Sequence, residues 1–404
     1  MRSTSKILTT DELMEKSKQS LEPAIFDFIS GGSGTEWGLS NNLKAFQRHQ
    51  IIPRVLQQSG TIDTHSTLFG KKLSSPLIIA PCAFHKIASE QGELATAKAA
   101  ARTDTIFTLS TMSTCSIEDV ASASTSDKWF QLYIFKNKQI TKELVKRAEE
   151  AGYRALVVTV DVPAMGMRIK DIRNQFSLPL GIEAVNFKKY GLASLSDKTD
   201  GSKVKEHTDQ QFDSDLGWDS IDWLRSITRL PIILKGILNP ADASEAIKHK
   251  IDGIIVSNHG GRQIDSIISP LDALPEIVKT TKNKIPIIVD GGIRNGEDIF
   301  KAIALGANAV MIARPVMWAL SVGGEDEVVA LLSRLQNEFT LTMRLAGCNT
   351  LQIIRDRGLS LLSGANITAL RFLDLLRKVE SSPTSEDAVK TISTIRFFMN
   401  NTQQ

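Results

Sequence analysis

A short apolar run followed by a helical pattern recurs along the middle of this chain. Eight such runs, rich in β-branched residues, have the pattern of buried strands, and helical stretches such as 141–152, 240–250 and 295–306 lie between them. Because strand–helix alternation pairs strands in parallel, eight units over about 240 residues predict an α/β fold, a closed (β/α)8 TIM barrel. The rival is an open doubly wound sheet, but no GxGxxG turn follows the first strand. The predicted strands are 76–81, 105–110, 129–135, 155–161, 231–236, 253–259, 286–292 and 309–314.

Segments on either side of the barrel, and one within it, depart from the repeat. Residues 1–75 predict an N-terminal helical extension, with an amphipathic helix around 22–29 before a glycine-rich turn. Residues 185–217 are polar and predict a mobile loop over the barrel mouth. Amphipathic pieces at 367–379 and 385–400 predict peripheral C-terminal helices within 350–404. We expect one domain over 1–404, with the barrel at about 76–348.

Composition excludes several classes of protein. The 404 residues carry a net charge of only +3, without a basic block, so we expect no nucleic-acid partner. No apolar run approaches the length of a membrane span, and the start of the chain lacks the apolar core of a signal peptide. The cysteines, Cys82, Cys115 and Cys348, lack the spacing of a metal site. These features predict a soluble cytoplasmic protein without a metal.

The segment Ser257–Gln263 (SNHGGRQ) contains the residue types of a proton-transfer site. It follows the apolar run 253–256, so the strand brings a base, His259, and a cation, Arg262, to its C-terminal end. The two glycines between them allow a sharp turn beside a flat ligand. A base and an anion clamp three residues apart suit proton abstraction from an acid-bearing substrate. A lone His-x-x-Arg is more often a solvated strand cap, so this interpretation depends on the other strand ends.

Charged and polar residues also stand at the other strand ends, which converge on one barrel mouth. An Asp or Lys at a single strand end is usually structural, but a whole set around one mouth is hard to explain in that way. The last two strands end in Gly-Gly-x-Arg and in Arg, an arrangement that binds phosphate through backbone N–H groups and guanidinium. We therefore predict a phosphate-bearing cofactor or substrate. The residues in question are Tyr133, Asp161, Arg168, Lys235, Asp290, Arg294 and Arg314.

The chain resembles the FMN-dependent 2-hydroxy acid oxidases and dehydrogenases, the family of glycolate oxidase, lactate oxidase and mandelate dehydrogenase. The resemblance covers about residues 10–350, and SNHGGRQ matches the active-site signature of that family. Within the family the chain is most similar to 4-hydroxymandelate oxidase. Three segments support this: 25–36 (IFDFISGGSGTE), 159–163 (TVDVP) and 314–320 (RPVMWAL).

The resemblance implies a role for each charged residue at the mouth. His259 would take a proton from the substrate, either from Cα or from the hydroxyl, and Asp161 would stabilise the imidazolium that forms. Arg168 and Arg262 would bind the substrate carboxylate, and Tyr133 would hydrogen-bond a substrate oxygen.

The same resemblance implies FMN as the cofactor. Lys235 would lie beside flavin N1 and the C2 carbonyl, where it stabilises negative charge. The phosphate would rest on Asp290 to Arg294 and on Arg314. The cofactor-binding residues implied are Pro81, Cys82, Ala83, Ser110, Gln131, Thr159, Lys235, Ser257, Asp290, Gly291, Gly292, Ile293, Arg294, Ala313 and Arg314.

Three departures from the family pattern concern the substrate. Most members have a second tyrosine where this chain has Phe28, and glycolate oxidase has a bulky Trp at the position of Met112 and an Arg at that of Met167. An apolar aromatic face and flexible methionines favour a larger side chain over glycolate. We therefore expect an (S)-2-hydroxy acid with an aromatic or bulky group, of the mandelate or 4-hydroxymandelate type.

The electron acceptor and the assembly follow from the same resemblance. Membrane-bound dehydrogenases of the family carry an apolar anchor after strand four, whereas 185–217 is polar here, which favours O2 as acceptor and H2O2 as product. The resemblance places the small side chain of Ala83 against the flavin, which agrees with an oxidase. The family also implies a homo-oligomer, a tetramer. The alternatives are a soluble dehydrogenase with another acceptor and a lactate-like substrate, a non-redox sugar-phosphate barrel enzyme, and a flavoprotein that has lost catalysis.

Overall fold

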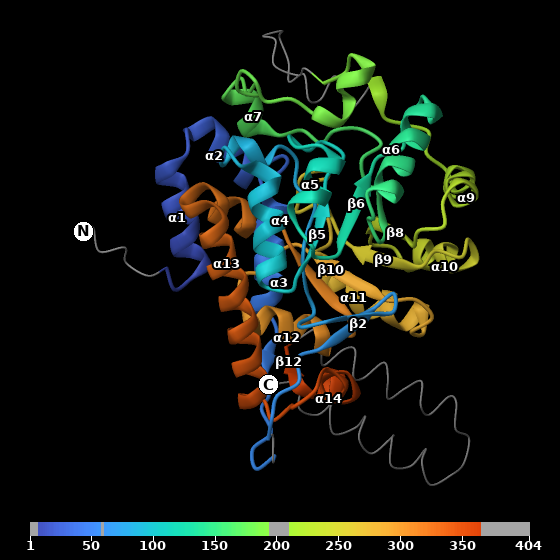
Figure 1. Cartoon of the computed structure of the whole chain (residues 1–404). Coiled ribbons are helices and arrows are strands. Elements are labelled where there is room, and N and C mark those ends of the chain that lie inside the picture. The colour runs from blue at the N-terminus through green and yellow to red at the C-terminus, as the bar shows by residue number, and fades with distance from the viewer. Residues whose placement is uncertain (1–6, 58–59, 194–209, 365–404) are drawn as a thin grey trace.

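A closed barrel of eight parallel strands forms the centre of this computed structural model, which describes residues 7–57, 60–193 and 210–364 (Figure 1). The strands follow one another around the barrel in chain order, and β11 pairs back to β4. All eight predicted runs form strands, so the predicted TIM barrel is confirmed. Their bounds are β4 (Leu77–Ile79), β5 (Ile106–Leu109), β6 (Lys128–Leu132), β7 (Leu156–Thr159), β8 (Ile232–Ile237), β9 (Gly253–Val256), β10 (Ile287–Asp290) and β11 (Ala309–Ile312).

A helix follows each barrel strand and covers its outer face. The predicted helices at 141–152, 240–250 and 295–306 are present, and the Asn239 side chain caps α10 by accepting a hydrogen bond from Ala241 N at 2.9 Å. The last helix bends at Gly323 and Gly324, whose backbone is not helical. The helices are α4 (Gly92–Arg102), α5 (Ile117–Ala123), α6 (Lys138–Glu150), α9 (Trp218–Ile227), α10 (Pro240–Lys248), α11 (Pro270–Thr281), α12 (Gly296–Ala304) and α13 (Arg314–Leu345).

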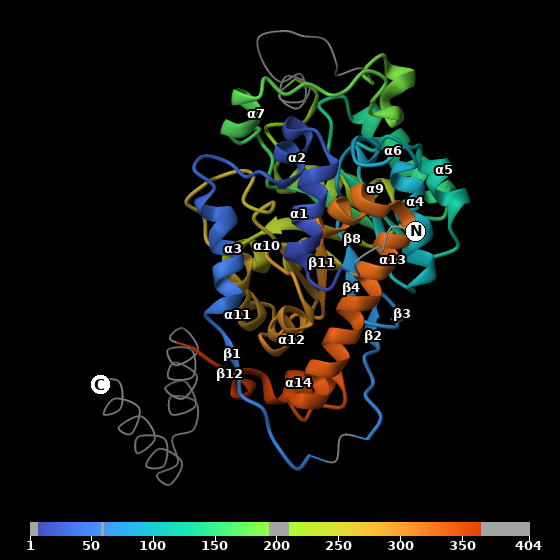
Figure 2. The ribbon, with the colours of Figure 1, turned by 90° about the vertical axis from the view of Figure 1, so that its left-hand side faces the viewer.

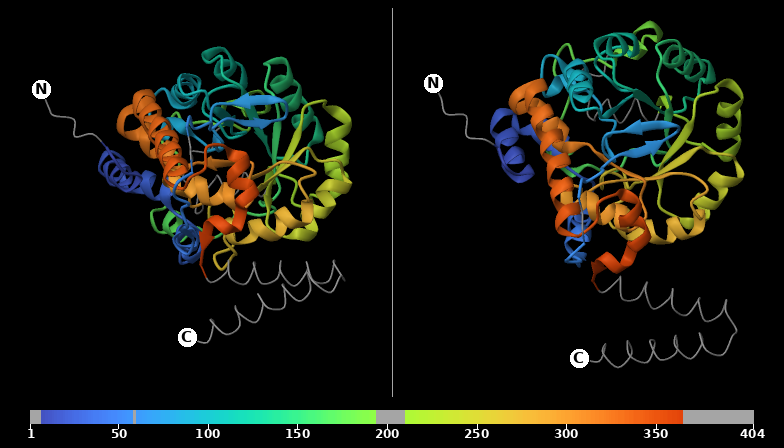
Figure 3. Two further views of the ribbon diagram at one scale, coloured as in Figure 1. Left: turned by 90° about the horizontal axis from the view of Figure 1, so that it is seen from below. Right: turned by 60° about the horizontal axis from the view of Figure 1, so that its bottom comes forward.

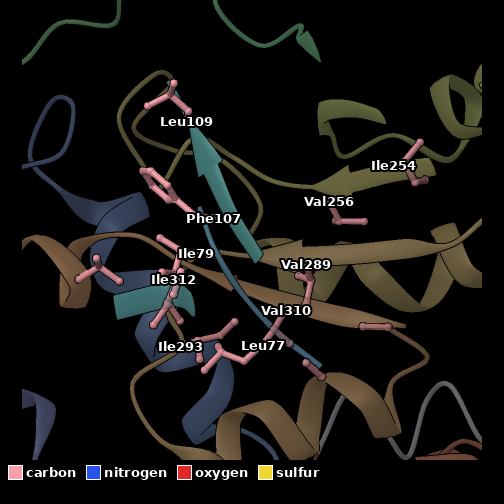
Figure 4. Packing of buried hydrophobic residues seen from close by; sticks show 14 of the residues in the cluster. Leu77, Ile79, Phe107, Leu109, Ile254, Val256, Val289, Ile293, Val310 and Ile312 are labelled. Carbon is pink, nitrogen blue, oxygen red and sulfur yellow. The ribbon is translucent and has the colours of Figure 1, made fainter. Parts of the chain in front are cut away.

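Strand residues alternate between the two faces of the barrel wall. One set, which includes Ile79, Leu109, Val256 and Ile312, packs with the helices into the larger core (Figure 4). The other set, which includes Trp129, packs inside the barrel. Because the side-chain period of a strand is two, polar residues two positions after an inward apolar residue also point inward. This places Gln131, Thr159, Lys235, Ser257 and Asp290 in one layer at the C-terminal end of the barrel.

A hairpin closes the N-terminal end of the barrel. Strands β2 (Ser66–Leu68) and β3 (Lys71–Leu73) pair in antiparallel fashion and lie across this end (Figure 3). Leu68, Leu73 and Phe69 pack against the inner core cluster, so apolar side chains fill this end of the barrel. A ligand can therefore enter the barrel only from its C-terminal end.

The N-terminal extension consists of α1 (Thr10–Ser20), α2 (Pro23–Ser30) and α3 (Trp37–Gln47), so the helix predicted at 22–29 is present. These helices stand along one side of the barrel, and α1 packs on α13 (Figure 2). After α3, the short strand β1 (Gln50–Ile51) pairs with β12 (Leu362–Ser363). Strand β12 follows α14 (Leu351–Arg357) and η3 (Gly358–Leu361) in the chain. The helices predicted at 367–379 and 385–400 lie outside the described residues.

The described residues between β7 and α9 include the short helices α7 (Ile169–Arg173) and η2 (Val185–Tyr190). These residues are attached to the barrel, since Tyr190 Oη donates to Glu143 at 2.6 Å and Phe212 forms a β-bridge with Phe135. The central part of the loop predicted to be mobile, 194–209, lies outside the described residues. Among the helices that are described, none is long and apolar enough to cross a bilayer.

Candidate active site

A pocket opens at the C-terminal end of the barrel, and residues from all eight strand ends line it. It contains every site residue predicted from the sequence except Asp161, Ser257 and Met167; Asp161 is hydrogen-bonded to the lining residue His259, and Ser257 to the lining residue Lys235. The first five strand ends supply Pro81, Cys82, Ala83, Ser110, Met112, Gln131, Tyr133, Thr159 and Lys235. The last three supply His259, Arg262, Asp290, Gly291, Gly292, Ile293, Arg294, Ala313 and Arg314, while Phe28 comes from α2 and Arg168 from the loop after β7.

His259 and Asp161 form a half-buried pair at this mouth. His259 Nδ1 lies 2.8 Å from Asp161 Oδ1, so Nε2 is the ring nitrogen left for a substrate. Gly236, with φ of +114°, makes room for the carboxylate, because a Cβ there would lie 2.5 Å from Asp161 Cβ. Burial lowers the pKa of His259, and the charge of Asp161 partly opposes that shift. Burial also acts to raise the pKa of Asp161, but the charge and hydrogen bond of His259 lower it below its usual value. A neutral imidazole with a charged carboxylate behind it is equipped to accept a proton.

Two half-buried guanidinium groups, those of Arg168 and Arg262, lie near this base. Burial lowers the pKa of both, and for Arg168 the neighbouring charge of Arg262 lowers it further. Arg168 Nε is buried without a hydrogen-bond partner. In the described part of the chain, neither group forms a salt bridge with a carboxylate, although the charge of Asp171 partly opposes the lowering of both pKa values. Two neighbouring cations that form no salt bridge make this part of the pocket a site for an anion.

Lys235 lies at the centre of the polar layer inside the barrel. Its Nζ is 3.1 Å from Asp290 Oδ2 and donates to Ser257 Oγ at 2.7 Å. Burial acts to lower the pKa of Lys235, but the charges of Asp290 and Asp161 raise it above its usual value, so the ammonium stays protonated. Asp290 Oδ1 is buried without a partner. The site therefore combines the fixed positive charge of Lys235 with an Asp290 oxygen that can still accept a hydrogen bond.

Side-chain hydrogen bonds hold the other half of the polar layer in place. Gln131 Nε2 donates to Thr159 Oγ1 at 3.0 Å, and Gln131 Oε1 accepts from Ser110 Oγ at 3.3 Å and from Thr111 N at 3.1 Å. Ser110 Oγ in turn accepts from Met112 N at 3.1 Å, which fixes the loop that bears Met112. The layer thus presents donors and acceptors that are already oriented for the edge of a planar ligand.

The last two strand ends bring two further half-buried cations, Arg294 and Arg314, together. Arg294 stacks over the Trp318 ring at 5.1 Å, and Arg314 Nη2 donates to Gly31 O at 2.8 Å and Gly260 O at 2.9 Å. Burial lowers the pKa of Arg294 and of Arg314, and for Arg314 the charges of Arg262 and Arg294 add to the effect. Arg314 Nε is buried without a partner. A bound dianion such as a phosphate would relieve this repulsion, and the Gly291–Gly292 turn, whose φ values are positive, lines the same pocket.

An aromatic and thioether wall faces the charged residues. Phe28 stacks on Phe176 with ring centroids 4.3 Å apart, and the Arg262 guanidinium lies over the Phe28 ring, 5.4 Å from its centroid. Met112 lines the pocket, as predicted. Met167, which we expected to matter for the pocket, does not line it, because its side chain is 68% exposed and points to solvent.

Sequence reasoning missed Phe212. This residue lines the pocket and stacks on Tyr133 with centroids 4.4 Å apart and an angle of 16° between the rings. It is far from Tyr133 in the chain, and only the pairing of its segment with the end of β6 brings the two rings together. A lone aromatic residue in a polar stretch was the available signal. Other lining residues that we did not predict include Ile29, Phe84, Val162, Met165 and Met317.

Comparison with known proteins points in the same direction as the geometry. The family model described as FMN-dependent dehydrogenase matches residues 17–361. A peroxisomal (S)-2-hydroxyacid oxidase of Arabidopsis thaliana is 45% identical over 346 residues, which is 85% of this chain and 94% of that protein. The glycolate oxidase of Spinacia oleracea is 42% identical over 348 residues, or 86% of this chain and 94% of that protein.

Among solved structures, mandelate oxidase with (S)-4-hydroxymandelic acid superimposes with a TM-score of 0.84 and 40% identity. The match covers 88% of this chain and 98% of that one. The relatives thus include proteins named for a small and for an aromatic 2-hydroxy acid, so the side chains of this pocket must decide between them.

Proposed function

The chain belongs to the FMN-dependent dehydrogenase family, and we propose that it oxidises an (S)-2-hydroxy acid to the 2-oxo acid while O2 is reduced to H2O2. One observation carries the proposal: the His259–Asp161 pair faces the same pocket as two half-buried guanidinium groups that form no salt bridge in the described part of the chain. A base beside an anion site is what removal of a proton from a carboxylic acid substrate requires.

The residues of the pocket fit FMN. Arg294, Arg314 and the Gly291–Gly292 turn would hold the phosphate, and the unpartnered Arg314 Nε supplies a donor for it. Lys235, together with Ser110, Gln131 and Thr159, would hold the polar edge of the ring system. When bound, FMN accepts the two electrons that the substrate loses. The buried ammonium of Lys235 stabilises the negative charge that accompanies this reduction.

His259 receives the proton that the substrate gives up, from Cα or from the hydroxyl. Burial keeps the imidazole neutral before the reaction, and the proton enters at Nε2 because Nδ1 is bonded to Asp161. Asp161 then stabilises the imidazolium by its charge. The pair thus separates two tasks, since burial sets the resting state of the base and the carboxylate stabilises its protonated state.

Arg168, Arg262 and Tyr133 orient the substrate. The two guanidinium groups bind its carboxylate, and the phenol of Tyr133 donates a hydrogen bond to a substrate oxygen. Burial raises the pKa of Tyr133 to about 12, so this phenol remains a donor throughout the working pH range. Arg262 Nη1 donates hydrogen bonds to the carbonyl oxygens of Phe28 and Gly31 at 2.8 and 2.9 Å. These two contacts fix the orientation of the guanidinium group in the pocket.

A visible spectrum of the purified protein followed by anaerobic addition of substrate tests this function. We expect the absorption bands of bound flavin and their bleaching by (S)-mandelate. A colourless protein would favour a non-redox phosphate-binding barrel enzyme. Bound flavin that no 2-hydroxy acid reduces would favour a flavoprotein without this activity.

The proposed substrate carries an aromatic or bulky group. Phe28 gives the pocket an apolar side chain at a position where the hydroxyl of a tyrosine would favour a small polar substrate. The flexible side chain of Met112 can adapt to a larger substrate, and Phe212 adds a second aromatic ring to the lining. Values of kcat/KM for (S)-mandelate, (S)-4-hydroxymandelate, (S)-lactate and glycolate test this assignment. A clear preference for glycolate would contradict it.

The proposed electron acceptor is O2. Two features support it: the polar composition of 185–217 and the small side chain of Ala83 in the pocket lining. An oxygen electrode and a peroxide assay, run with and without an artificial dye, separate the alternatives. Fast dye reduction without peroxide would identify a dehydrogenase.

The assembly and the location complete the proposal. Family resemblance supports a homo-oligomer, a tetramer, and the composition supports a cytoplasmic protein without nucleic-acid or membrane partners. Light scattering after gel filtration measures the first, and fractionation of cells measures the second. A monomer, or a protein that sediments with membranes, would contradict the corresponding part.

A further inference from the structure

Asn42 is a buried amide on a helix outside the barrel. It belongs to α3, yet it is only 1% exposed, and its partner is Asn258, next to the base His259. The two amides pair reciprocally: Asn42 Nδ2 donates to Asn258 Oδ1 at 2.9 Å, and Asn258 Nδ2 donates to Asn42 Oδ1 at 2.7 Å. Buried amides require such partners, so the pair fixes α3 against the turn that contains His259.

The turn that receives this contact has an unusual backbone. His259, Gly260 and Gly261 have φ values of 56°, 66° and 72°, a left-handed run that is costly for a histidine. Asn258 holds the turn from inside, since its Oδ1 also accepts from Gly261 N at 3.1 Å and its Nδ2 donates to Ile268 O at 3.2 Å. Such a conformation persists only where the surroundings determine it, and Asn42 is part of those surroundings.

Asn42 also contacts the glycine turn that follows β10. A Cβ on Gly292 would lie 2.3 Å from the carbonyl oxygen of Asn42, and one on Gly291 would lie 3.2 Å from its Nδ2. Both glycines have positive φ and line the pocket beside Arg294. One residue therefore packs against the base-bearing turn and against the turn that would hold the phosphate.

We propose that Asn42 is a positioning residue that ties the turn Ser257–Gln263 to the Gly291–Gly292 turn, so that retention of FMN and placement of His259 depend on one amide pair. This inference rests on the proposed function, because it takes His259 as the base and the glycine turn as the phosphate site. It gives the N-terminal extension a part in the reaction without any contact to substrate.

Two substitutions separate hydrogen bonding from packing. Asn42→Asp keeps the shape but turns one N–H···O contact into an O···O contact, and Asn42→Leu removes both hydrogen bonds and leaves the amide of Asn258 partly unpaired. The neighbouring Asn41 is a matched control, because on the same helix its side chain accepts an exposed hydrogen bond from Arg48 at 3.1 Å. Leu224→Ala, a core truncation in α9, controls for general loss of stability.

Two quantities are measured on the holoenzymes at a temperature well below unfolding: the FMN released on dilution, followed by its fluorescence, and the rate of anaerobic flavin reduction at saturating (S)-mandelate. For Asn42→Leu we expect FMN to be held at least about tenfold more weakly and to be reduced at least about tenfold more slowly. Asn42→Asp should impair both quantities as well. Asn41→Leu and Leu224→Ala should change neither by more than about twofold.

The proposal is overturned if Asn42→Leu behaves like Asn41→Leu, or if only one of the two quantities changes, since the tie between the turns would then be absent. It is also overturned if Leu224→Ala, at an equal loss in Tm, produces the same two effects. Failure of the proposed function is distinguishable, because it would appear in the unsubstituted protein as flavin that no 2-hydroxy acid reduces.

Discussion

Replacing Asp161 by Asn tests the pairing on which the proposed chemistry depends. The amide oxygen can still accept the hydrogen bond from His259 Nδ1, which lies 2.8 Å from Oδ1, so the geometry is preserved and only the charge is lost. Opposite charges about 4 Å apart interact by about 4 kcal/mol at an effective dielectric constant of about 20. This interaction exists fully only after the proton has reached the imidazole. We therefore expect the rate of anaerobic flavin reduction to fall about 10²- to 10³-fold.

The pH profile of Asp161→Asn should shift in a defined direction. Asp161 raises the pKa of His259 against the larger lowering by burial, so its loss lowers that pKa further. Activity is lost on the acid side when the base becomes protonated. The acid limb of kcat/KM should therefore move to lower pH while the maximum rate falls.

Stopped-flow reduction over a pH series measures both effects, and a second His–Asp pair supplies the control. Asp222 Oδ1 lies 2.8 Å from His249 Nδ1 on the surface, with Asp222 57% exposed, so Asp222→Asn removes the same contact away from the pocket. It should leave the rate and the profile unchanged. A loss of less than about fivefold in Asp161→Asn, or an acid limb that moves to higher pH, would refute the reasoning.

Three further substitutions test other parts of the site. His259→Asn should lower kcat by about 10²- to 10⁴-fold with bound flavin retained, and turnover close to that of the unsubstituted protein would remove His259 as the base. Arg168→Met should raise KM about 10- to 100-fold in steady-state assays, because a charge-assisted contact to the carboxylate is lost; an unchanged KM would contradict that role. Met112→Trp fills a wall that is only 5% exposed, so kcat/KM for (S)-mandelate should fall at least about tenfold relative to glycolate, and an equal loss for both substrates would place Met112 outside the substrate region.

The strand ends show how far the sequence predicts the site. Lys235, Ser257 and Asp290 each stand two positions after an apolar residue of the inner barrel, so strand periodicity alone places them in one inward layer. Eight strand–helix units then require closure, and closure brings the ends of distant strands to one mouth. This part of the fold is predictable because each element depends on residues that are near to one another in the chain.

Other features required long-range packing and were not predictable in the same way. Arg262 and Arg314 were assigned to substrate and phosphate, yet both also hold the carbonyl of Gly31, more than two hundred residues away. Phe212 reaches Tyr133 only because its segment pairs with the end of β6. Met167 lies in the loop after β7, close in the chain to Arg168, but its side chain is exposed to solvent.

The sequence by itself therefore determined the barrel, the mouth and the residue types that meet there, because hydrophobic periodicity and the C-terminal position on a strand are local properties of the chain. Only the tertiary structure decided which nitrogen of His259 faces the substrate, which guanidinium atoms remain free, and that Asn42 packs against two turns of the site. Those outcomes depend on side-chain direction and on contacts across more than two hundred residues, which form only when the N-terminal helices pack against the closed barrel.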